Sequence, residues 1–376
     1  MINEDLMRSF RQYKKQIEIG HIKISFFKKI LLSLFFFILF FTFPITFFYK
    51  KKNKDFIYIF PFSNKEPMKS IVSKLQTIPN SKIIIRPNSF KVVPLNLYKD
   101  YLIFLLNNPQ WTISNLDFFG ALALKISKYY GYKVKYGCSK LLLFQEYSFY
   151  ISYLTYLFEK DNGKLYGLMH GIPGEEASFF RFSKFFVWSK YFKNYYVNNN
   201  ADVKQFKIVG SIVHNNLREK YIVEGREKYD IVYALQGDLY SNYKYKVMIL
   251  ELLEELKNDL KYKIAIKEHP IYRDTLPTHN FDILNNSSYE ILFSSKLIIS
   301  QFSTMLYDAK SLNKGAFALL PKEKIELVSY LEDEEIGFSK DESYKKIIHL
   351  IKANKENNFK VDDGINPLER IKNEIC

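Results

Sequence analysis

The chain has 376 residues, carries a net charge of +15, and is 47% hydrophobic. This length and apolar content suit two ordinary globular domains and exclude an intrinsically disordered protein. The two cysteines, Cys138 and Cys376, are too few for a disulfide framework or a zinc site, so we expect a reducing compartment and no structural metal.

The positive charge is concentrated near the N-terminus. Residues 1–54 hold eleven Lys or Arg residues against three acidic ones, a net charge of +8, which leaves +7 for the other 322 residues. No zinc-finger spacing, RNP-like string or Arg-rich helix accompanies these charges. The distribution therefore favours a membrane surface as partner and argues against nucleic acid.

An apolar segment at residues 30–49 lies between lysines on both sides. As a helix it would reach roughly 30 Å, the thickness of the hydrocarbon core of a bilayer. The segment is too long for a signal peptide and no small-residue cleavage site follows it. We therefore predict a transmembrane or membrane-anchoring helix at 30–49. A helix lying in the membrane plane, kinked at Pro44, is the alternative.

Beyond residue 54, strand-like apolar runs alternate with helical patterns, which predicts parallel sheets covered by helices. In the first half the expected strands are 56–60, 83–85, 140–144, 165–169, 185–188 and 206–209, and the expected helices are 116–130 and 148–158. In the second half the expected strands are 231–235, 264–266, 297–299 and 316–320, and the expected helices are 243–257, 303–312 and 344–351.

These elements predict an α/β chain with two doubly wound Rossmann-type domains that face a cleft. The expected parts are a basic N-terminal region at 1–54, a first domain at 55–213, a linker or connecting helix at 214–229, a second domain at 230–358 and a polar tail or helix at 359–376.

Three polar motifs each follow a predicted strand. They are Met169-His170-Gly171-Ile172-Pro173, Lys267-Glu268-His269-Pro270 and Ser300-Gln301-Phe302-Ser303-Thr304. In open α/β sheets, ligands bind outside the carboxyl ends of the strands, where helix N-termini and loop amides converge on anions. Two histidines and a Ser/Thr helix cap at such places indicate a phosphate-bearing donor.

Together with Val187-Trp188-Ser189 and Val209-Gly210-Ser211, these motifs resemble bacterial GT-B transferases that build surface polymers. The group includes relatives of CDP-glycerol glycerophosphotransferases, capsule polysaccharide transferases and bacterial sialyltransferases. The resemblance covers about residues 55 to 355 in order and spacing. It implies that the His-Pro motif and the Ser/Thr motif that follows it bind the donor phosphates, and that a residue of the first domain deprotonates the acceptor.

Residue chemistry supports the same donor site. His269 can donate to a phosphate oxygen while Pro270 fixes the turn. Ser303 and Thr304 open a helix whose hydroxyls and free amides suit a second oxygen, although an ordinary N-cap uses the same groups. The further donor-binding candidates are Ser300, Lys267, Arg273 and, for ribose or base, Gln236, Gly237 and Asp238, which also fit a simple turn. Because arginine is scarce, Arg181 and Arg273 gain interest as residues near the motifs.

For the catalytic base we favour His170, because a neutral imidazole with a pKa of about 6.5 can accept the proton of an attacking hydroxyl. Glu175 or Glu176 is the alternative. Bacterial sialyltransferases place an acidic pair before a glycine, whereas here Gly174 precedes the pair. The glutamates also fit a solvated helix start.

The resemblance implies a nucleotide-sugar-dependent glycosyltransferase that moves a sugar, sialic acid or Kdo among the options, from a CMP-, CDP- or UDP-linked donor to a surface polysaccharide or lipid-linked acceptor. Inversion by one base is the simplest outcome, and no metal or other cofactor is required. The alternatives are a CDP-polyol phosphotransferase or a non-catalytic, membrane-anchored scaffold of a polymer-assembly complex. We expect the bacterial inner membrane, with the catalytic domains on the cytoplasmic side, where nucleotide donors occur.

Overall fold

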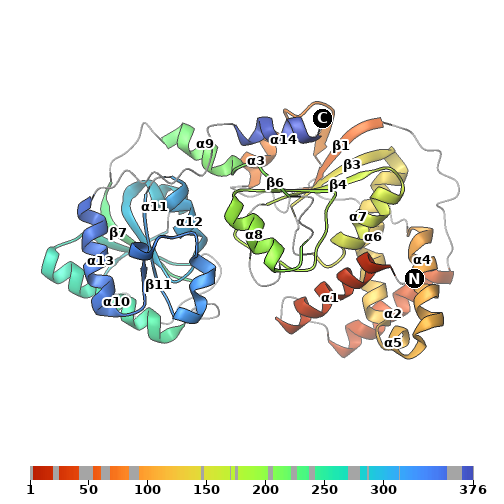
Figure 1. The fold of residues 1–376 in the computed structure, drawn as a ribbon, viewed down its shortest axis with the longest axis horizontal. Helices are drawn as coiled ribbons and strands as arrows, with labels where there is room; N and C mark the ends of the chain where they lie inside the picture. The colour runs from red at the N-terminus through yellow and green to blue at the C-terminus, as the bar shows by residue number, and fades with distance from the viewer. Residues whose placement is uncertain are drawn as a thin grey trace. The chain divides into compact units, whose positions relative to one another are not determined.

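The computed structural model divides the chain into two compact units (Figure 1). Unit 1 comprises Met1–Ser211 with Ile365–Cys376, and unit 2 comprises Ile212–Gly364. Each unit contains a six-stranded parallel sheet with helices, which confirms the predicted α/β class. The residues that the structure describes are 3–19, 25–41, 54–60, 68–83, 93–144, 148–169, 171–173, 177–201, 206–221, 227–236, 242–269, 280–285, 288–312, 314–353 and 366–375.

The sheet of unit 1 has the strand order β2-β1-β3-β4-β5-β6. Its strands are β1 (Lys54–Phe60), β2 (Ser81–Ile83), β3 (Cys138–Leu143), β4 (Lys164–Leu168), β5 (Lys184–Val187) and β6 (Phe206–Ile208). Successive residues of β3, Leu141, Leu142 and Leu143, are all fully buried. Continuous burial of this kind is typical of parallel strands with both faces covered, and it is why their sequences lack alternation.

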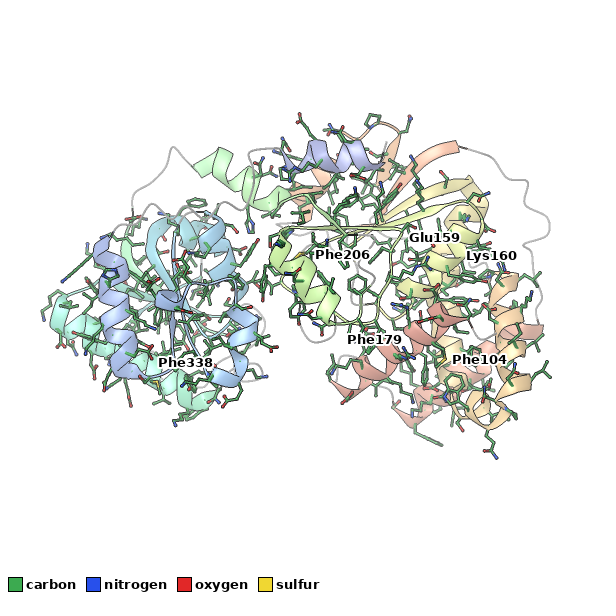
Figure 2. The ribbon with its side chains drawn as sticks, viewed as in Figure 1. Phe104, Glu159, Lys160, Phe179, Phe206 and Phe338 are labelled. Atoms are coloured by element: carbon green, nitrogen blue, oxygen red, sulfur yellow. The ribbon has the colours of Figure 1, made fainter. Side chains whose placement is uncertain are left out.

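Aromatic side chains fill the core beside β5 and β6. The rings of Phe180 and Phe185 lie 5.1 Å apart, and Tyr196 packs edge-on against Phe185 at 5.0 Å. Phe206, labelled in Figure 2, packs edge-on against Phe185 at 5.7 Å. Edge-to-face geometry is favourable between aromatic rings, so this cluster fixes how the loop before β5 packs on the sheet.

Helices of unit 1 include α3 (Met68–Leu75), α4 (Leu95–Asn107), α5 (Pro109–Ser114), α6 (Leu116–Tyr136), α7 (Ile151–Lys160) and α8 (Lys190–Asn198). Helix α6 was expected to end at Tyr130, before Gly131, but it continues for a further six residues. It ends at Gly137, which has φ 66 and supplies the left-handed conformation of a helix C-terminus. A single interior glycine costs a helix only about 1 kcal/mol, which packing readily offsets.

Both ends of the chain pack onto unit 1, beyond the expected limits of 55–213. Helix α1 (Glu4–Glu18) packs against α7, and Tyr153 N–H donates to the hydroxyl of Ser9 over 3.1 Å. Helix α14 (Pro367–Ile375) buries Ile371, and the ammonium of Lys140 in β3 donates to the Ile375 carbonyl over 2.6 Å. The basic N-terminal region and the region predicted as a polar tail or helix therefore each contribute a helix to this unit.

Helix α2 (Phe26–Phe41) begins four residues before the predicted membrane segment. It packs against α6 at Gly120, where an added Cβ would collide with the Leu32 carbonyl oxygen. Among the residues that the structure describes, no helix has both the length and the apolar character needed to cross a bilayer. The predicted spanning helix at 30–49 is therefore unsupported, and its residues 42–49 lie outside the described residues.

The sheet of unit 2 has the strand order β12-β11-β10-β7-β8-β9. Its strands are β7 (Tyr229–Ala234), β8 (Ile264–Lys267), β9 (Asp282–Leu284), β10 (Ser295–Ser300), β11 (Gly315–Leu319) and β12 (Ile336–Gly337). The four strands expected from the sequence are β7, β8, β10 and β11. The short β9 and β12 escaped prediction because three and two residues carry no usable periodicity.

Helices of unit 2 include α9 (Ile212–Tyr221), α10 (Tyr243–Leu260), α11 (Ser288–Ser294), α12 (Thr304–Ser311) and α13 (Lys340–Ala353), with 3-10 turns η3 (Lys322–Val328) and η4 (Asp333–Glu335). The helix predicted at 243–257 is α10, whose Leu253 and Leu256 pack with Ile231, Ile299 and Phe317 in one core. Helix α9 occupies much of the stretch at 214–229 that was predicted as a linker. A connecting helix was the alternative expected for this polar stretch, and the structure has one.

Candidate functional site

The motifs of unit 2 meet at one edge of its sheet because of the strand register. Ile299 of β10 pairs with Tyr233 of β7, and Ala234 of β7 pairs with Lys267 of β8. All three strands are parallel, so the segments that follow them leave the sheet at its carboxyl edge. Gln236, His269 and Ser303 follow these strands directly.

The topology singles out one position on this edge. From β7 the chain moves to β8 and β9 on one side, and β10 then returns to the other side of β7. The boundary between β7 and β10 is therefore a topological switch point, the place where open α/β sheets bind ligands. Two hydrogen bonds tie the strand ends there. The Ser300 hydroxyl donates to the Ala234 carbonyl over 2.7 Å, and Phe302 N–H donates to Gln236 Oε1 over 3.0 Å.

Two helix N-termini converge at this switch point. Ser303 is the N-cap of α12, and its hydroxyl accepts from Met305 N–H over 3.3 Å. The N-cap of α10 is Asn242, whose N–H donates to Gln301 Oε1 over 3.0 Å and whose carbonyl accepts from Gln301 Nε2 over 3.1 Å. The free amides and partial positive charges of both helix ends favour an anion.

His269 follows β8 on the neighbouring side of β7 and is half-buried. Burial lowers its pKa below the ordinary value of 6.5, and the nearby ammonium of Lys267 lowers the pKa further. The imidazole is therefore neutral at pH 7 and carries one N–H donor. Lys267 is half-buried, and its ammonium donates to the backbone carbonyl of Glu268 over 2.9 Å, which keeps it on the same edge.

The structure thus places most of the predicted donor-binding residues at one edge: Gln236, Lys267, His269, Ser300, Ser303 and Thr304. Their side chains differ in availability, since Thr304 is exposed while Ser300 is fully buried and uses its hydroxyl within the sheet. The other donor-binding candidates, Gly237, Asp238, Pro270 and Arg273, lie outside the described residues.

The proposed catalytic residues His170, Glu175 and Glu176 also lie outside the described residues. The chain around them is described. Strand β4 ends at Leu168, and the Met169 carbonyl accepts a hydrogen bond from Trp188 Nε1 over 3.1 Å. Trp188 thereby fixes the backbone of the residue that follows β4, at the carboxyl edge of the sheet of unit 1.

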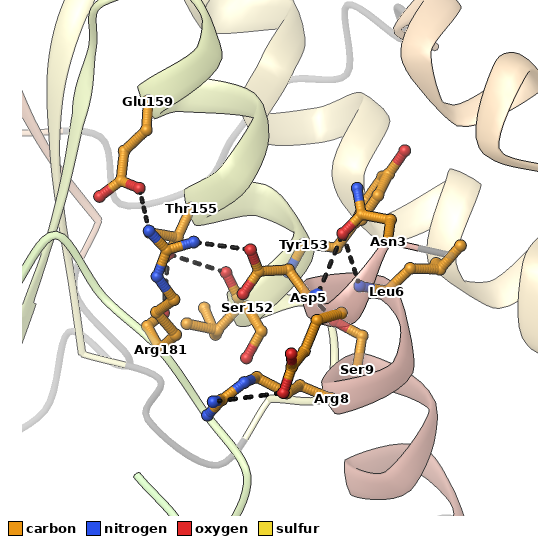
Figure 3. A network of polar contacts seen from close by, with 12 residues as sticks. Asn3, Asp5, Leu6, Arg8, Ser9, Ser152, Tyr153, Thr155, Glu159 and Arg181 are labelled. Carbon is orange, nitrogen blue, oxygen red and sulfur yellow. Dashed lines mark hydrogen bonds and ion pairs between the residues drawn. The ribbon is translucent and has the colours of Figure 1, made fainter. Parts of the chain in front are cut away.

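Arg181 was singled out in the sequence as an arginine near a motif, but in the structure it joins helices. Its guanidinium pairs with Asp5 of α1 at 2.6 Å and with Glu159 of α7 (Figure 3). The Thr155 hydroxyl donates to its backbone carbonyl over 2.7 Å. Both carboxylates come from the same unit, so the charge of Arg181 is used in holding α1 in place.

Sequence reasoning missed two features of unit 2. Gln301 lay inside a quoted motif, but its role depends on Asn242, 59 residues earlier in the chain. His214 was assigned to the polar linker, whereas its Nε2 lies 2.5 Å from Asp308 of α12 and both side chains are buried. For Gln301, its position directly after a predicted strand was a signal in the sequence. For His214, the sequence held no such signal. Within the described ranges, no three His, Cys, Asp or Glu side chains gather in a way that could hold a metal ion.

No protein-family model and no curated protein matches the chain. Solved structures do resemble it. The UDP-GlcNAc 2-epimerase from Neisseria meningitidis has a TM-score of 0.53 at 14% identity, covering 85% of this chain and 99% of its own. The enzyme of the same name from Methanocaldococcus jannaschii has a TM-score of 0.52 at 14% identity, with 86% and 99% covered.

The wall teichoic acid polymerase TagF has a TM-score of 0.47 at 13% identity, covering 99% of this chain and 96% of its own. At the identities of the two epimerases, the likeness shows the fold alone. The chain has an α/β fold of the GT-B-like kind, with parallel sheets.

Proposed function

We propose that the chain is a transferase that uses a nucleotide-activated donor, and that unit 2 binds the donor phosphates at the switch point between β7 and β10. The observation that carries the proposal is the pair of hydrogen bonds by which Gln301 holds the N-terminus of α10 beside that of α12. Two helix N-termini held close together favour a ligand with several negative charges. A protein of this fold binds UDP-GlcNAc, which is compatible with a nucleotide sugar.

The reaction we propose is glycosyl transfer with inversion. The acceptor hydroxyl oxygen forms a bond to the anomeric carbon of the donor while the bond from that carbon to the phosphate oxygen breaks. The nucleotide takes the electron pair and gains negative charge. The helix N-termini, the N–H of His269 and the ammonium of Lys267 stabilise this charge as it develops. In this proposal the acceptor proton passes to His170, with Glu175 or Glu176 as the alternative base.

The same donor site also suits a CDP-polyol phosphotransferase, because the groups described at the switch point recognise phosphate and not the transferred group. Attack would then occur at phosphorus. The proposed setting is the cytoplasmic face of a bacterial inner membrane, with a surface polysaccharide or a lipid-linked acceptor. Neither version of the proposed reaction uses a metal ion in any step.

A nucleotide-binding screen tests the proposal. Calorimetric titration of the whole chain with CMP, CDP, UDP and GDP should reveal one preferred nucleotide. Cytidine preference supports sialic acid, Kdo or polyol-phosphate transfer, and uridine preference supports hexose transfer. His269→Ala should weaken binding at least about tenfold, a change of 1.4 kcal/mol. His349→Ala, which removes an exposed histidine on α13, is the matched control and should leave binding unchanged.

Two results would contradict the proposal. If no nucleotide binds, the donor site is wrong. If nucleotide binds but no candidate donor and acceptor pair yields product, the chain is a scaffold of a polymer-assembly complex and not an enzyme.

A further inference from the structure

Helix α2 presents an apolar stripe to solvent. Phe26 and Phe27 are 81% and 69% exposed, and Ile30, Leu31 and Leu34 are exposed as well. These positions fall on one side of a helix, because residues three and four apart lie on the same face. The helix contacts α6 through the region of Leu32, so this stripe is not the face that packs against α6.

Helix α4 is apolar on two faces. One face buries Leu97, Tyr101 and Phe104 in the core of unit 1. A second face holds the exposed Leu95, Leu102 and Leu106, of which Leu106 is 82% exposed. A helix on the surface of a water-soluble protein normally presents polar residues there. The apolar exposure of α4 therefore needs a partner other than water.

The two stripes belong to one region of unit 1. Gly120, in the N-terminal half of α6, abuts the backbone of α2 at Leu32. One residue earlier, Phe119 packs against Phe104 of α4 and Trp111 of α5, with ring centroids 6.2 Å and 6.3 Å apart. Helices α2, α4 and α5 therefore all pack against the N-terminal half of α6. We call their exposed surfaces the α2–α4–α5 face.

Exposed large hydrophobic residues are unevenly distributed over the described parts of the chain. Nine of the fourteen lie on the α2–α4–α5 face, including Ile113 of α5 at 60% exposure. The remaining five are scattered over both units. Single exposed apolar residues are normal on protein surfaces, but nine of them on three helices that pack around the N-terminal half of α6 indicate a binding surface.

Positive charge accompanies this apolar surface. Lys28 and Lys29 of α2 and Lys99 of α4 are exposed, and α2 contains no acidic residue. Burial lowers the pKa of Lys125 in α6, and the like charges of Lys128 and Lys28 lower that pKa further, which shows that these ammonium groups lie near one another. Clustered lysines beside exposed Phe and Leu complement anionic lipid headgroups above acyl chains.

We propose that the α2–α4–α5 face docks unit 1 onto an anionic lipid bilayer, with its helices lying in the membrane interface. The apolar side chains enter the boundary between headgroups and acyl chains, to a depth of about 5–10 Å, while the lysines remain among the phosphates. The partner that fits this face is a lipid surface and not another protein. The apolar stripes match the acyl chains of a lipid leaflet, and the lysines match its anionic headgroups.

Vesicle co-sedimentation of the whole chain tests this proposal. Binding should be stronger to vesicles that contain phosphatidylglycerol than to pure phosphatidylcholine, and it should weaken as salt rises. Leu102→Ser with Leu106→Ser should reduce binding at least about tenfold. These side chains are exposed, so the melting temperature should not change. Lys28→Gln with Lys29→Gln should remove most of the preference for the anionic lipid.

The matched control is Leu260→Ser with Ile325→Ser, which removes two exposed aliphatic side chains of unit 2 and should leave vesicle binding unchanged. Three outcomes overturn the proposal: no binding to either kind of vesicle, wild-type binding by the Leu102 and Leu106 double variant, or an equal loss in the control. A fourth outcome also overturns it: light scattering shows that the wild type is a dimer, the double variant is a monomer, and neither protein binds vesicles. The α2–α4–α5 face would then pair two copies of the chain.

Discussion

At the scale of single residues, the protonation state of His269 gives a testable link between pH and ligand binding. Burial and Lys267 hold its pKa below 6.5 in the free protein. A bound phosphate would place negative charge beside the ring and raise that pKa. Binding should therefore take up protons, and affinity should rise as pH falls from about 7.5 to about 6.0, by at most about tenfold per pH unit.

Calorimetry in two buffers of different ionisation enthalpy measures this proton uptake. His269→Ala should retain only the uptake that the nucleotide phosphate itself contributes, so the difference between the two proteins isolates the imidazole. Equal proton uptake by wild type and variant would show that His269 does not face the bound phosphate.

Gln301 is the second residue whose role can be tested alone. Gln301→Ala removes both hydrogen bonds to Asn242, which should lower nucleotide affinity about tenfold and stability by only about 1 kcal/mol. Ser295→Ala is the matched control, because Ser295 is equally buried at the opposite end of β10, where its hydroxyl donates to the Leu292 carbonyl. Titration and thermal melting separate the two effects. An equal loss of affinity in both variants would mean that general stability, and not the placement of α10, controls binding.

The candidate site shows which residue roles a sequence can reveal. The N-cap at Ser303 was predictable because capping is local and the residue follows an apolar strand. The roles of Ser300 and Gln301 were not, because their partners Ala234 and Asn242 are 66 and 59 residues away. Local patterns find the ends of elements, whereas hydrogen bonds between elements depend on the completed sheet.

At the scale of elements, α1 shows why a well-packed helix can escape prediction. Its buried face includes Ser9, Gln12 and Gln16 beside Leu6 and Tyr13, so no apolar periodicity marks it. Those polar groups are instead hydrogen-bonded across the interface, for example Ser178 to Gln12 over 3.1 Å. Buried polar groups with partners cost little, and this allows a polar face to pack.

The ion pairs of Arg181 should contribute measurably to the stability of this interface. Arg181→Met leaves Asp5 and Glu159 without their shared cation, so the free energy of unfolding should fall by about 1–3 kcal/mol at pH 7. Burial already raises the pKa of Asp5, with Arg181 opposing that shift, and the variant raises it further. Because the pKa of Asp5 is higher in the folded variant than in the unfolded chain, protonation of Asp5 stabilises the folded variant. The loss of unfolding free energy caused by Arg181→Met should therefore shrink as pH falls toward about 4.5.

Urea unfolding at the two pH values measures the effect of Arg181. Arg11→Met is the control, since Arg11 is an exposed cation of the same helix and exposed charges contribute little to stability. A loss for Arg181→Met that does not depend on pH would indicate lost packing and not unpaired carboxylates.

At the scale of the whole molecule, the alternation of strands and helices was enough to predict an α/β chain with parallel sheets. It could not assign the ends of the chain to a unit. Helix α14 belongs to unit 1, although more than 150 residues of unit 2 separate it from Ser211. Its ion pairs reach two strands, with Lys184 of β5 at 2.6 Å and Lys207 of β6 at 2.9 Å from the Glu374 carboxylate. Charges paired over such sequence distances leave no local pattern.

The carboxylate of Glu374 is therefore expected to couple the last helix to the sheet of unit 1. Its hydrogen bonds to Lys184 and Lys207 lower its pKa below 4.5. A lowered folded-state pKa contributes stability above the unfolded-state value and loses it as pH falls through the folded-state value. Glu374→Gln should lower the free energy of unfolding by up to about 1 kcal/mol at pH 7, because the pairs are partly exposed, and the difference from wild type should shrink as pH falls below 4.5.

Hydrogen exchange can assign this loss to one unit. Amides of β5 and β6 should exchange faster in Glu374→Gln, while those of β7 should be unchanged, since β7 belongs to unit 2. Glu369→Gln changes an exposed carboxylate of the same helix and should leave both sets unchanged. Faster exchange in β7 as well would mean that the two units unfold together. Equal effects of Glu374→Gln and Glu369→Gln would mean that the net charge of α14 stabilises unit 1, and not the pairing of Glu374 with the strand lysines.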